Sequence, residues 1–221
     1  MQETRRKDKG VDVRGSYIVA SAPSDLRGDY GCEIWISSTI PLFINNGVKH
    51  FVKTDDISIF HSSPRFLFIR VVSGPFSFIV VSAHSPHSRN SDLVDWHKDF
   101  SQKLETCVSK YKTVLIGIDF NVRFKHNQID NQFYGGVSCG TPSPHGDEIV
   151  DFYRGSGISL VSTFSKLTGE MFTRDPHTCV HKTGSHVFTD DYIASTADVI
   201  WPKTVSYTHL RAHETGRSLV C

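Results

Sequence analysis

Short apolar runs bounded by glycine, proline, serine and asparagine fill the first part of the chain and predict β-strands. Residues 32–37 alternate between apolar and polar side chains, and residues 57–60 form a short apolar run. Residues 66–72 and 76–82 flank a Ser-Gly-Pro turn at 73–75, which predicts a β-hairpin. We therefore expect this part of the chain to be built mainly of sheet.

A helical repeat follows over residues 91–111, where apolar side chains recur at three- and four-residue steps and form one face. These side chains are Leu93, Trp96, Phe100, Leu104, Cys107, Val108 and Tyr111. Ser91 stands where a helix N-cap is expected. Residues 113–118 are then almost continuously apolar, which is typical of a strand buried in the centre of a sheet. The order predicts a helix that covers the strand following it.

The pattern is weaker beyond the glycine- and proline-rich loop at 135–144. Residues 147–153 predict a short helix that ends before Gly155. Further strands are expected at 158–161, 170–173 and 187–194. Together these elements predict a layered α/β domain with a mainly antiparallel sheet core.

Composition agrees with one globular domain, since 38% of the 221 residues are hydrophobic and 21% are charged. No apolar stretch approaches the ~20 residues that span a bilayer, so we expect no membrane partner. The formal net charge of +1 does not by itself indicate nucleic-acid binding. A local basic cluster at residues 5–9 is interpreted as a solvated loop rather than as a phosphate-binding patch.

The segment at 115–122 carries the strongest chemical signal, because Asp119 and Asn121 follow an apolar strand. Side chains two residues apart on a strand point to the same side. A carboxylate can orient or deprotonate a water or bind a metal, while an amide donates to a phosphate oxygen without adding negative charge. The alternative is an Asp/Asn pair that only begins a turn.

Five other short motifs stand with this one in a definite order. In full the series is Gln2-Glu-Thr4, Gly28-Asp-Tyr-Gly-Cys-Glu-Ile-Trp-Ile36, Val81-Ser-Ala-His-Ser-Pro86, Gly117-Ile-Asp-Phe-Asn121, Met171-Phe-Thr173 and Asp191-Tyr-Ile193. The series resembles that of the endonuclease/exonuclease/phosphatase superfamily, and the resemblance covers residues 1–204. It implies an α/β fold, a four-layered sandwich with two mixed or mainly antiparallel sheets.

Within that superfamily, the sequence details are most similar to the non-LTR (LINE-type) retrotransposon endonucleases. The supporting motifs are Gly-Cys-Glu-Ile-Trp at 31–35, His-Ser-Pro-His-Ser at 84–88, Gly-Glu-Met-Phe-Thr at 169–173 and Asp-Tyr-Ile-Ala at 191–194. The resemblance implies a Mg²⁺-dependent phosphodiesterase, with Mn²⁺ as a substitute, that nicks DNA. It also implies an intracellular protein, nuclear if it is a retroelement product, with a reverse transcriptase downstream in the same polyprotein.

The resemblance assigns roles to particular residues. Glu3 matches the glutamate that holds the catalytic divalent cation, and a carboxylate suits Mg²⁺. Asp119 is implied to position or activate the attacking water, and Asn121 to contact the scissile phosphate. Ile118 stands where relatives carry a glycine, and Gly117 comes one position early.

Two histidines and a second aspartate complete the candidate site. His84 is implied to donate a proton or hydrogen bond to the phosphate or the departing oxygen, since imidazole titrates near neutral pH. His87 is a further candidate for phosphate contact. Asp191 matches an aspartate that orients a catalytic histidine, although Asp190 beside it could face the site instead. His-x-Cys-x-His at 177–181 leaves a structural zinc site open as an alternative to a polar loop.

The ends of the chain differ from the superfamily pattern. Residues 206–215 show no periodicity and resemble a peptide translated from a sequencing-library adaptor, so we expect 205–221 to be a non-native tail. An Asn-bearing strand before Gln-Glu-Thr and a final Ser-Asp-His motif are not found. We therefore expect a domain truncated at both ends, lacking its first strand, that is itself nearly inactive.

Two other functions stay open on the sequence. One is another superfamily phosphodiesterase or phosphatase, acting on abasic-site DNA, a phosphoinositide or a sphingolipid. The other is a catalytically inactive fragment that keeps the fold.

Overall fold

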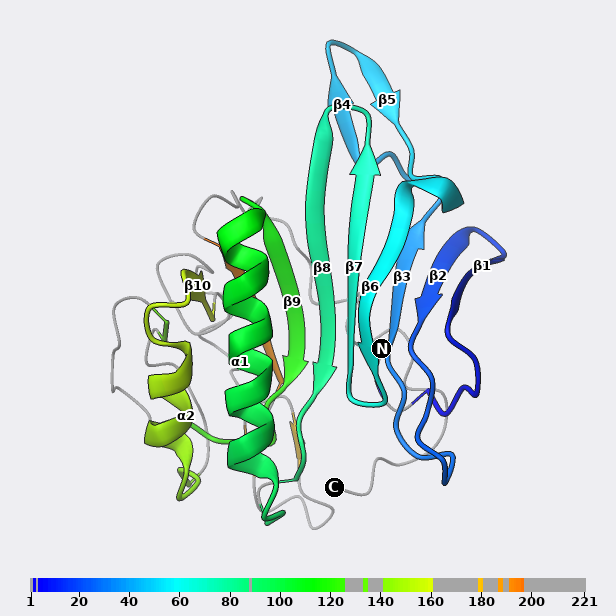
Figure 1. Ribbon diagram of the computed structural model, residues 1–221. Helices are drawn as coiled ribbons and strands as arrows, with labels where there is room; N and C mark the ends of the chain where they lie inside the picture. The colour runs from blue at the N-terminus through cyan, green and yellow to red at the C-terminus, as the bar shows by residue number, and fades with distance from the viewer. Residues whose placement is uncertain are drawn as a thin grey trace.

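A six-stranded mixed sheet forms the centre of the molecule (Figure 1). The computed structural model describes residues 2, 4–87, 89–125, 133–134 and 141–160, and the backbone of 179–180, 187–188 and 191–196. In sheet order the strands are β10 (Ile158–Ser159), β13 (Asp191–Thr196), β9 (Val114–Asp119), β8 (Phe76–His84), β7 (Phe66–Ser73) and β6 (Ile57–Ser63). Strands β8 and β9 are parallel, and the other neighbouring pairs of this sheet are antiparallel. The mainly antiparallel core expected from the sequence is therefore confirmed.

Two helices cover one face of this sheet. Helix α1 (Leu93–Lys110) connects the parallel strands β8 and β9, and α2 (Gly146–Tyr153) lies beside it (Figure 1). The apolar stripe of α1 buries Phe100 and Leu104 in one core with Val81 and Ile116 of the sheet. The apolar stripe predicts that this face of α1 packs on the sheet, because burial of apolar side chains is favourable and only one face of the helix is apolar.

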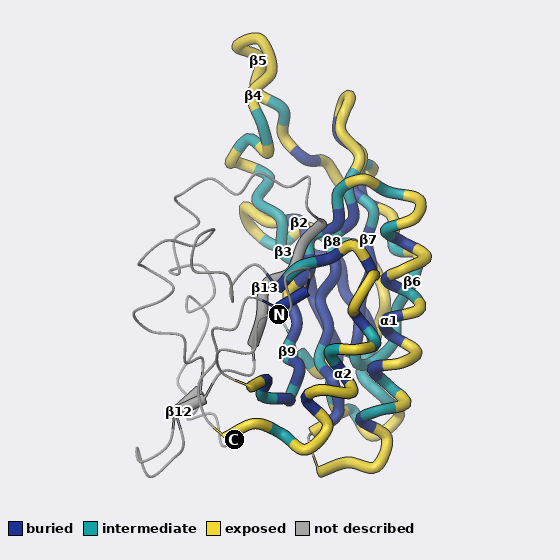
Figure 2. The backbone as a smooth tube through the Cα atoms, turned by 90° about the vertical axis from the view of Figure 1, so that its left-hand side faces the viewer, coloured by how far each residue is buried: buried dark blue, intermediate teal, exposed yellow. Residues whose placement is uncertain are grey.

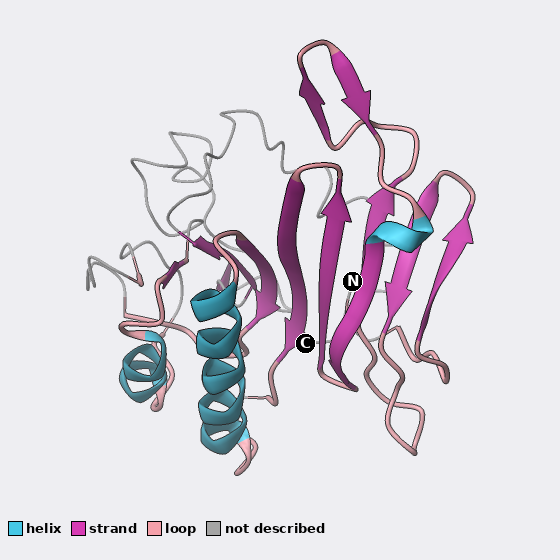
Figure 3. Ribbon diagram, turned by 45° about the horizontal axis from the view of Figure 1, so that its top comes forward, coloured by secondary structure: helices cyan, strands magenta, loops and turns pink. Residues whose placement is uncertain are grey.

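A three-stranded antiparallel sheet packs on the other face (Figure 3). It consists of β1 (Gly10–Arg14), β2 (Tyr17–Ser21) and β3 (Glu33–Ser37). Ile18, Ala20 and Ile34 form a second core with Leu67 and Ile69 of β7. The central strands of the large sheet are consequently buried on both faces (Figure 2). Helices, large sheet and small sheet give the α/β sandwich expected; among the described residues, no α-helix covers the outer face of the small sheet.

The outer face of the small sheet carries a charged network around a buried carboxylate. Glu33 is only 2% exposed and accepts hydrogen bonds from Arg14 Nη2 at 3.0 Å, Trp35 Nε1 at 2.9 Å and Ser21 Oγ at 3.2 Å. Arg6, from the basic cluster interpreted as a solvated loop, lies 3.6 Å from the same carboxylate. Buried charges persist when they are paired and hydrogen-bonded in this way.

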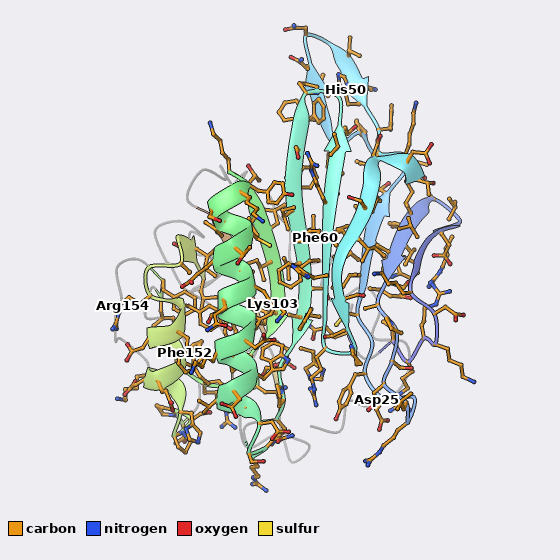
Figure 4. The ribbon with its side chains drawn as sticks, viewed as in Figure 1. Asp25, His50, Phe60, Lys103, Phe152 and Arg154 are labelled. Atoms are coloured by element: carbon orange, nitrogen blue, oxygen red, sulfur yellow. The ribbon has the colours of Figure 1, made fainter. Side chains whose placement is uncertain are left out.

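Two smaller hairpins complete the described elements. Strands β4 (Phe43–Asn45) and β5 (Val48–His50) project beyond the turn between β7 and β8, where Figure 4 labels His50. A short 3₁₀ helix, η1 (Thr54–Asp56), leads into β6. The backbones of β11 (Cys179–Val180) and β12 (Val187–Phe188) pair antiparallel.

Most predicted elements match observed ones within a few residues. Strands β3, β7, β8 and β9 and both helices lie where the pattern places them. The strand predicted at 187–194 is two strands, β12 and β13. The strand predicted at 170–173, the His-x-Cys-x-His side chains and the tail at 205–221 lie outside the described residues. In the part of the chain that the structure describes, no helix has the length and apolarity to cross a membrane.

Candidate active site

Three candidate residues stand in one row at the same end of the large sheet. His84, the last residue of β8, is the register partner of Asp119, the last residue of β9. Asp119 is in turn the register partner of Asp191, the first residue of β13. The chain thus brings residues far apart in sequence to adjacent backbone positions; the side chain of Asp191 lies outside the described residues.

His84 and Asp119 are in contact through their side chains. The imidazole Nε2 of His84 lies 3.5 Å from Asp119 Oδ2, and the two side chains are 12% and 21% exposed. Both groups are therefore mostly sheltered from solvent but still reachable from it. A weakly screened pair of this kind suits proton transfer and the orientation of a water molecule.

An aromatic–guanidinium pair borders His84. The ring of Tyr30 meets the ring of His84 edge-on, with centroids 6.2 Å apart. The guanidinium of Arg65 lies 3.8 Å from the centroid of Tyr30, and its Nη1 donates to the carbonyl oxygen of Ser85 at 3.0 Å. This arrangement places a fixed positive charge at the end of β8.

Asp119, Phe120 and Asn121 form a tight turn at the end of β9. The backbone N–H of Asn121 donates to Asp119 Oδ1 at 2.8 Å, which holds one carboxylate oxygen while the other faces His84. Asn121 has a φ of +49°, in the left-handed region that asparagine tolerates better than most residues. Its side-chain Nδ2 donates to the carbonyl oxygen of Ser85 at 3.0 Å.

Ser85 joins the ends of β8 and β9. Its N–H donates to the carbonyl oxygen of Asp119 at 2.9 Å, and its hydroxyl donates to that of Phe120. With the bond from Asn121, Ser85 contacts all three residues of the turn. Ser85 is fully buried, so these bonds form away from water.

The N-terminal segment reaches the same end of the sheet. The side-chain Nε2 of Gln2 donates to the carbonyl oxygen of Ala83 at 2.6 Å, one residue before His84. The backbone N–H of Thr4 donates to the carbonyl oxygen of Gly31 at 3.2 Å. Glu3, between these two residues, lies outside the described residues.

The remaining predicted features are placed as follows. His87 lies in the exposed loop after β8, where its Nδ1 accepts the N–H of Arg89 at 3.4 Å. Ile118, which replaces the glycine of the motif, is buried in the core below the helices, and Gly117 lies on β9 beside open space. Among the described side chains, no three His, Cys, Asp or Glu groups gather as metal ligands.

Comparison with solved structures identifies the fold. The endonuclease domain of TRAS1, a telomere-specific non-LTR retrotransposon, is 9% identical over 84% of this chain and 69% of its own, with a TM-score of 0.51. The catalytic domain of Xenopus laevis APE2 is 13% identical over 90% of this chain and 73% of its own, with a TM-score of 0.57. This chain therefore has the fold of the endonuclease/exonuclease/phosphatase superfamily. No protein-family model and no curated protein sequence matches it.

Sequence reasoning missed the residues that support the row. Ser85 lies in the His-Ser-Pro motif and Tyr30 in the Gly-Asp-Tyr-Gly motif, but the sequence alone indicates no role for either residue. Arg65 belongs to no motif, and its contact depends on the pairing of β7 with β8. The sequence pattern predicts this hairpin, but it does not show which side chain lies next to the end of β8.

Proposed function

We propose that this protein is a Mg²⁺-dependent phosphodiesterase that nicks one strand of DNA. The observation that supports it most directly is the row of His84, Asp119 and Asp191 across three adjacent strands, with Asn121 in the turn that follows. The fold supports the class, since one structure of similar fold is a retrotransposon endonuclease domain and another is the catalytic domain of APE2.

Asp119 would position and deprotonate the water that attacks phosphorus. Its Oδ1 is held by the Asn121 N–H, so the direction of Oδ2 is restricted before substrate arrives. Asn121 would contact the scissile phosphate. A carboxamide nitrogen carries two hydrogens, so one can stay on the Ser85 carbonyl oxygen while the other donates to a phosphate oxygen.

His84 would donate a proton or a hydrogen bond to the departing oxygen. Its contact with Asp119 Oδ2 supports this role, because a neighbouring carboxylate orients the imidazole ring. Asp191, the register partner of Asp119, is proposed to orient a catalytic histidine. His87, exposed just beyond β8, is proposed as a secondary phosphate contact.

The donors available at this end of the sheet suit a hard divalent cation. They are carboxylates, and Mg²⁺ prefers such oxygen ligands, as does Mn²⁺. Glu3 is the proposed ligand, and the hydrogen bond from Gln2 to Ala83 supports its segment being next to His84. When bound, Mg²⁺ would neutralise negative charge on the phosphate and the departing oxygen.

The finer assignment is a retroelement endonuclease acting on DNA in the nucleus. Its support is the set of short motifs in the sequence together with the fold shared with the TRAS1 domain. A reverse-transcriptase reading frame in the adjoining genomic sequence is expected on this proposal. A flanking sequence that encodes an unrelated protein would contradict the retroelement origin and leave the phosphodiesterase proposal standing.

The catalytic role of Asp119 can be tested by plasmid nicking. The purified protein is used in excess over supercoiled plasmid for several hours, in Mg²⁺ and in EDTA. We expect Mg²⁺-dependent nicking that falls by ~10²–10⁴-fold in Asp119→Ala, since the water-positioning carboxylate is lost.

The matched control is Asp95→Ala, which removes an exposed aspartate from the first turn of α1. It should nick at the wild-type rate. Equal nicking by Asp119→Ala, or nicking that persists in EDTA, would show that Asp119 and the metal do not act as proposed.

A further inference from the structure

A buried histidine of α1 contacts the turn that carries Asp119 and Asn121. His97 has no exposed surface and faces the sheet. Its Nε2 lies 3.4 Å from the carbonyl oxygen of Phe120, the residue between the two candidate catalytic residues. Its Nδ1 lies 2.9 Å from the hydroxyl of Tyr153, which α2 contributes. Residues on both helices thus connect to the turn.

The chemistry of the three groups sets the direction of both hydrogen bonds. A carbonyl oxygen only accepts, so Nε2 of His97 must carry the hydrogen. Nδ1 of the neutral ring then only accepts, so Tyr153 must donate its hydroxyl hydrogen. Burial lowers the pKa of His97 to about 3, against the opposing effect of its bond to Phe120, and burial raises the pKa of Tyr153. Both residues therefore stay neutral near pH 7.

Ring packing also restrains Phe120, whose carbonyl oxygen accepts the His97 hydrogen bond. The His97 ring stacks on the Phe120 ring with centroids 5.3 Å apart and planes 9° from parallel. The Tyr153 ring meets the Phe120 ring edge-on at 5.5 Å. His97 consequently contacts both the ring and the carbonyl group of Phe120, while Tyr153 contacts the Phe120 ring and the His97 imidazole.

The Phe120 carbonyl also accepts the hydroxyl of Ser85, so His97 supplies a second donor. One donor is enough to offset burial of a carbonyl, whereas a donor for each lone pair also restricts the rotation of its peptide plane. That peptide plane ends at the nitrogen of Asn121, which donates to Asp119 Oδ1. Rotation of the Phe120 carbonyl would therefore move the hydrogen bond that orients the carboxylate.

We propose that His97 and Tyr153 are positioning residues, which act through the Phe120 carbonyl to hold Asp119 and Asn121 in their catalytic geometry. This inference rests on the proposed function of Asp119 and Asn121. A misplacement of the order of 1 Å at a reacting group costs about 10²-fold in rate, so a positioning role affects catalysis without any contact with substrate.

The test compares four substitutions in the 221-residue chain. His97→Phe keeps an aromatic ring but removes the donor, whereas His97→Gln keeps a donor at the Nε2 position. Tyr153→Phe removes only the hydroxyl group. The matched control is Leu104→Ala, which removes buried packing from the same face of α1 about two turns further along and leaves both hydrogen bonds of His97 in place. Hydrogen exchange of the Asn121 backbone amide and ¹⁵N signals of the His97 ring are measured by NMR.

We expect the wild-type ring to show a hydrogen on Nε2 and none on Nδ1. Asn121 amide protection should fall about tenfold or more in His97→Phe, less in Tyr153→Phe, and stay near the wild-type value in His97→Gln. Leu104→Ala should lower protection only as far as its loss of global stability requires. His97→Phe protection equal to that of Leu104→Ala at matched stability, or a hydrogen on Nδ1, would overturn the inference.

Plasmid nicking gives a second, separate measurement. His97→Phe should lower the nicking rate at saturating protein about tenfold or more, because the geometry of Asp119 and Asn121 is disturbed. If the wild-type chain does not nick DNA in Mg²⁺, the proposed function fails, and the Asn121 exchange still decides whether His97 positions the turn. If His97→Phe does not fold, the Tyr153→Phe variant serves as the test. Asn121 amide protection in Tyr153→Phe that equals the wild-type value would then overturn the inference.

Discussion

Asn121 shows how much of the site depends on one residue's backbone and side chain together. Its left-handed φ turns the chain so that its N–H meets Asp119 Oδ1, while its side chain bonds to Ser85. Alanine here would lose the side-chain bond and be strained by about 1 kcal/mol or more in the left-handed conformation. Asparagine is therefore favoured at position 121 for two reasons: it tolerates the left-handed backbone conformation, and its side chain forms a hydrogen bond to Ser85.

Gly31 permits the close approach of the N-terminal segment, and its substitution should destabilise the fold. Its φ is +97°, and an added Cβ would lie 2.9 Å from Thr4 Oγ1 and 3.2 Å from the backbone nitrogen of Arg5. We expect Gly31→Ala to lower the free energy of unfolding by about 1–3 kcal/mol, from backbone strain and crowding together. Urea denaturation measures this change.

Substitutions at two other glycines separate the effect of backbone strain from the effect of crowding. Gly15 has a φ of +60° with nothing near its Cβ position, and Gly10 combines an unstrained backbone with open space. Gly15→Ala should cost about 1 kcal/mol and Gly10→Ala about 0.5 kcal/mol at most. A Gly31→Ala chain as stable as the Gly15→Ala chain would mean that the segment does not approach Gly31 in solution.

The buried His97 should make the fold less stable in acid. Burial lowers its pKa from 6.5 to about 3, so between these values the unfolded chain binds a proton that the folded chain does not. The stability that neutral, buried His97 contributes is fully present above pH 6.5, the pKa in the unfolded chain. It is lost as the pH falls toward about 3, the pKa in the folded chain. From pH 7 to pH 5 this group should remove roughly 2 kcal/mol from the free energy of unfolding.

His97→Gln provides the comparison, because glutamine does not titrate and the carboxylates are shared by both proteins. The difference in unfolding free energy between wild type and His97→Gln should change by roughly 2 kcal/mol over that pH range. Parallel pH profiles for the two proteins would show that His97 is accessible to protons in the folded state.

At the scale of elements, long periodic segments were predictable and short hairpins were not. The helix α1 and the strand β9 follow from period and continuous apolarity, because each buries a whole face or two faces. The hairpin of β4 and β5 went unpredicted, although Asn46 and Gly47 both have positive φ, as the common two-residue hairpin turn requires. Its strands are mostly exposed and lack the alternation that marks a half-buried strand.

The candidate site was predictable in part, for a similar reason. Asp119 and Asn121 follow a strand whose end is clear in the sequence, so their proximity is a local property. The row from His84 to Asp191 depends on which strands are neighbours, and the motif resemblance rather than the pattern indicated it. His97 and Tyr153 read as ordinary positions on two helices, because a buried polar pair cannot be recognised without the packing of α1 against α2.

Two buried cysteines should report the opening of separate elements. Cys107 lies on the covered face of α1, and Cys32 lies under the small sheet. Burial raises the pKa of Cys32 to about 12 and that of Cys107 to about 11. At pH 8 the thiolate fractions should be roughly 10³-fold and 10²-fold below that of an unperturbed thiol, which slows alkylation accordingly.

Iodoacetamide labelling resolved by peptide mass spectrometry measures each thiol, with the urea-unfolded chain as the reference. From the thiolate fractions Cys32 should be labelled roughly tenfold more slowly than Cys107, and a difference far from tenfold would mean that the small sheet and α1 open independently. Labelling of either thiol as fast in the native as in the unfolded chain would contradict its burial.

At the scale of the whole molecule, the candidate site and the projecting hairpin lie at opposite ends of β8 (Figures 1 and 3). The hairpin packs on the first residue of this strand, where Phe43 meets Phe76 at 3.9 Å, and His84 is the last residue. Nine residues at ~3.3 Å each separate the two ends by roughly 25 Å. Changes at the hairpin should therefore leave the site's chemistry unchanged.

The last prediction concerns the exposed apolar side chains of this hairpin. Ile44 is 61% and Val48 58% exposed, so they contribute little to folding but offer apolar surface to other molecules. The double substitution Ile44→Ser and Val48→Ser should change the free energy of unfolding by only about 0.5 kcal/mol and reduce self-association measured by light scattering. Plasmid nicking, where measurable, should be unchanged.

Phe43→Ser is the contrasting variant, since it removes the ring that stacks on His50 at 4.4 Å and should lower the free energy of unfolding by about 1–2 kcal/mol. A double variant that loses as much stability as Phe43→Ser would mean that the hairpin buries these side chains in solution, against the exposure that motivates the test.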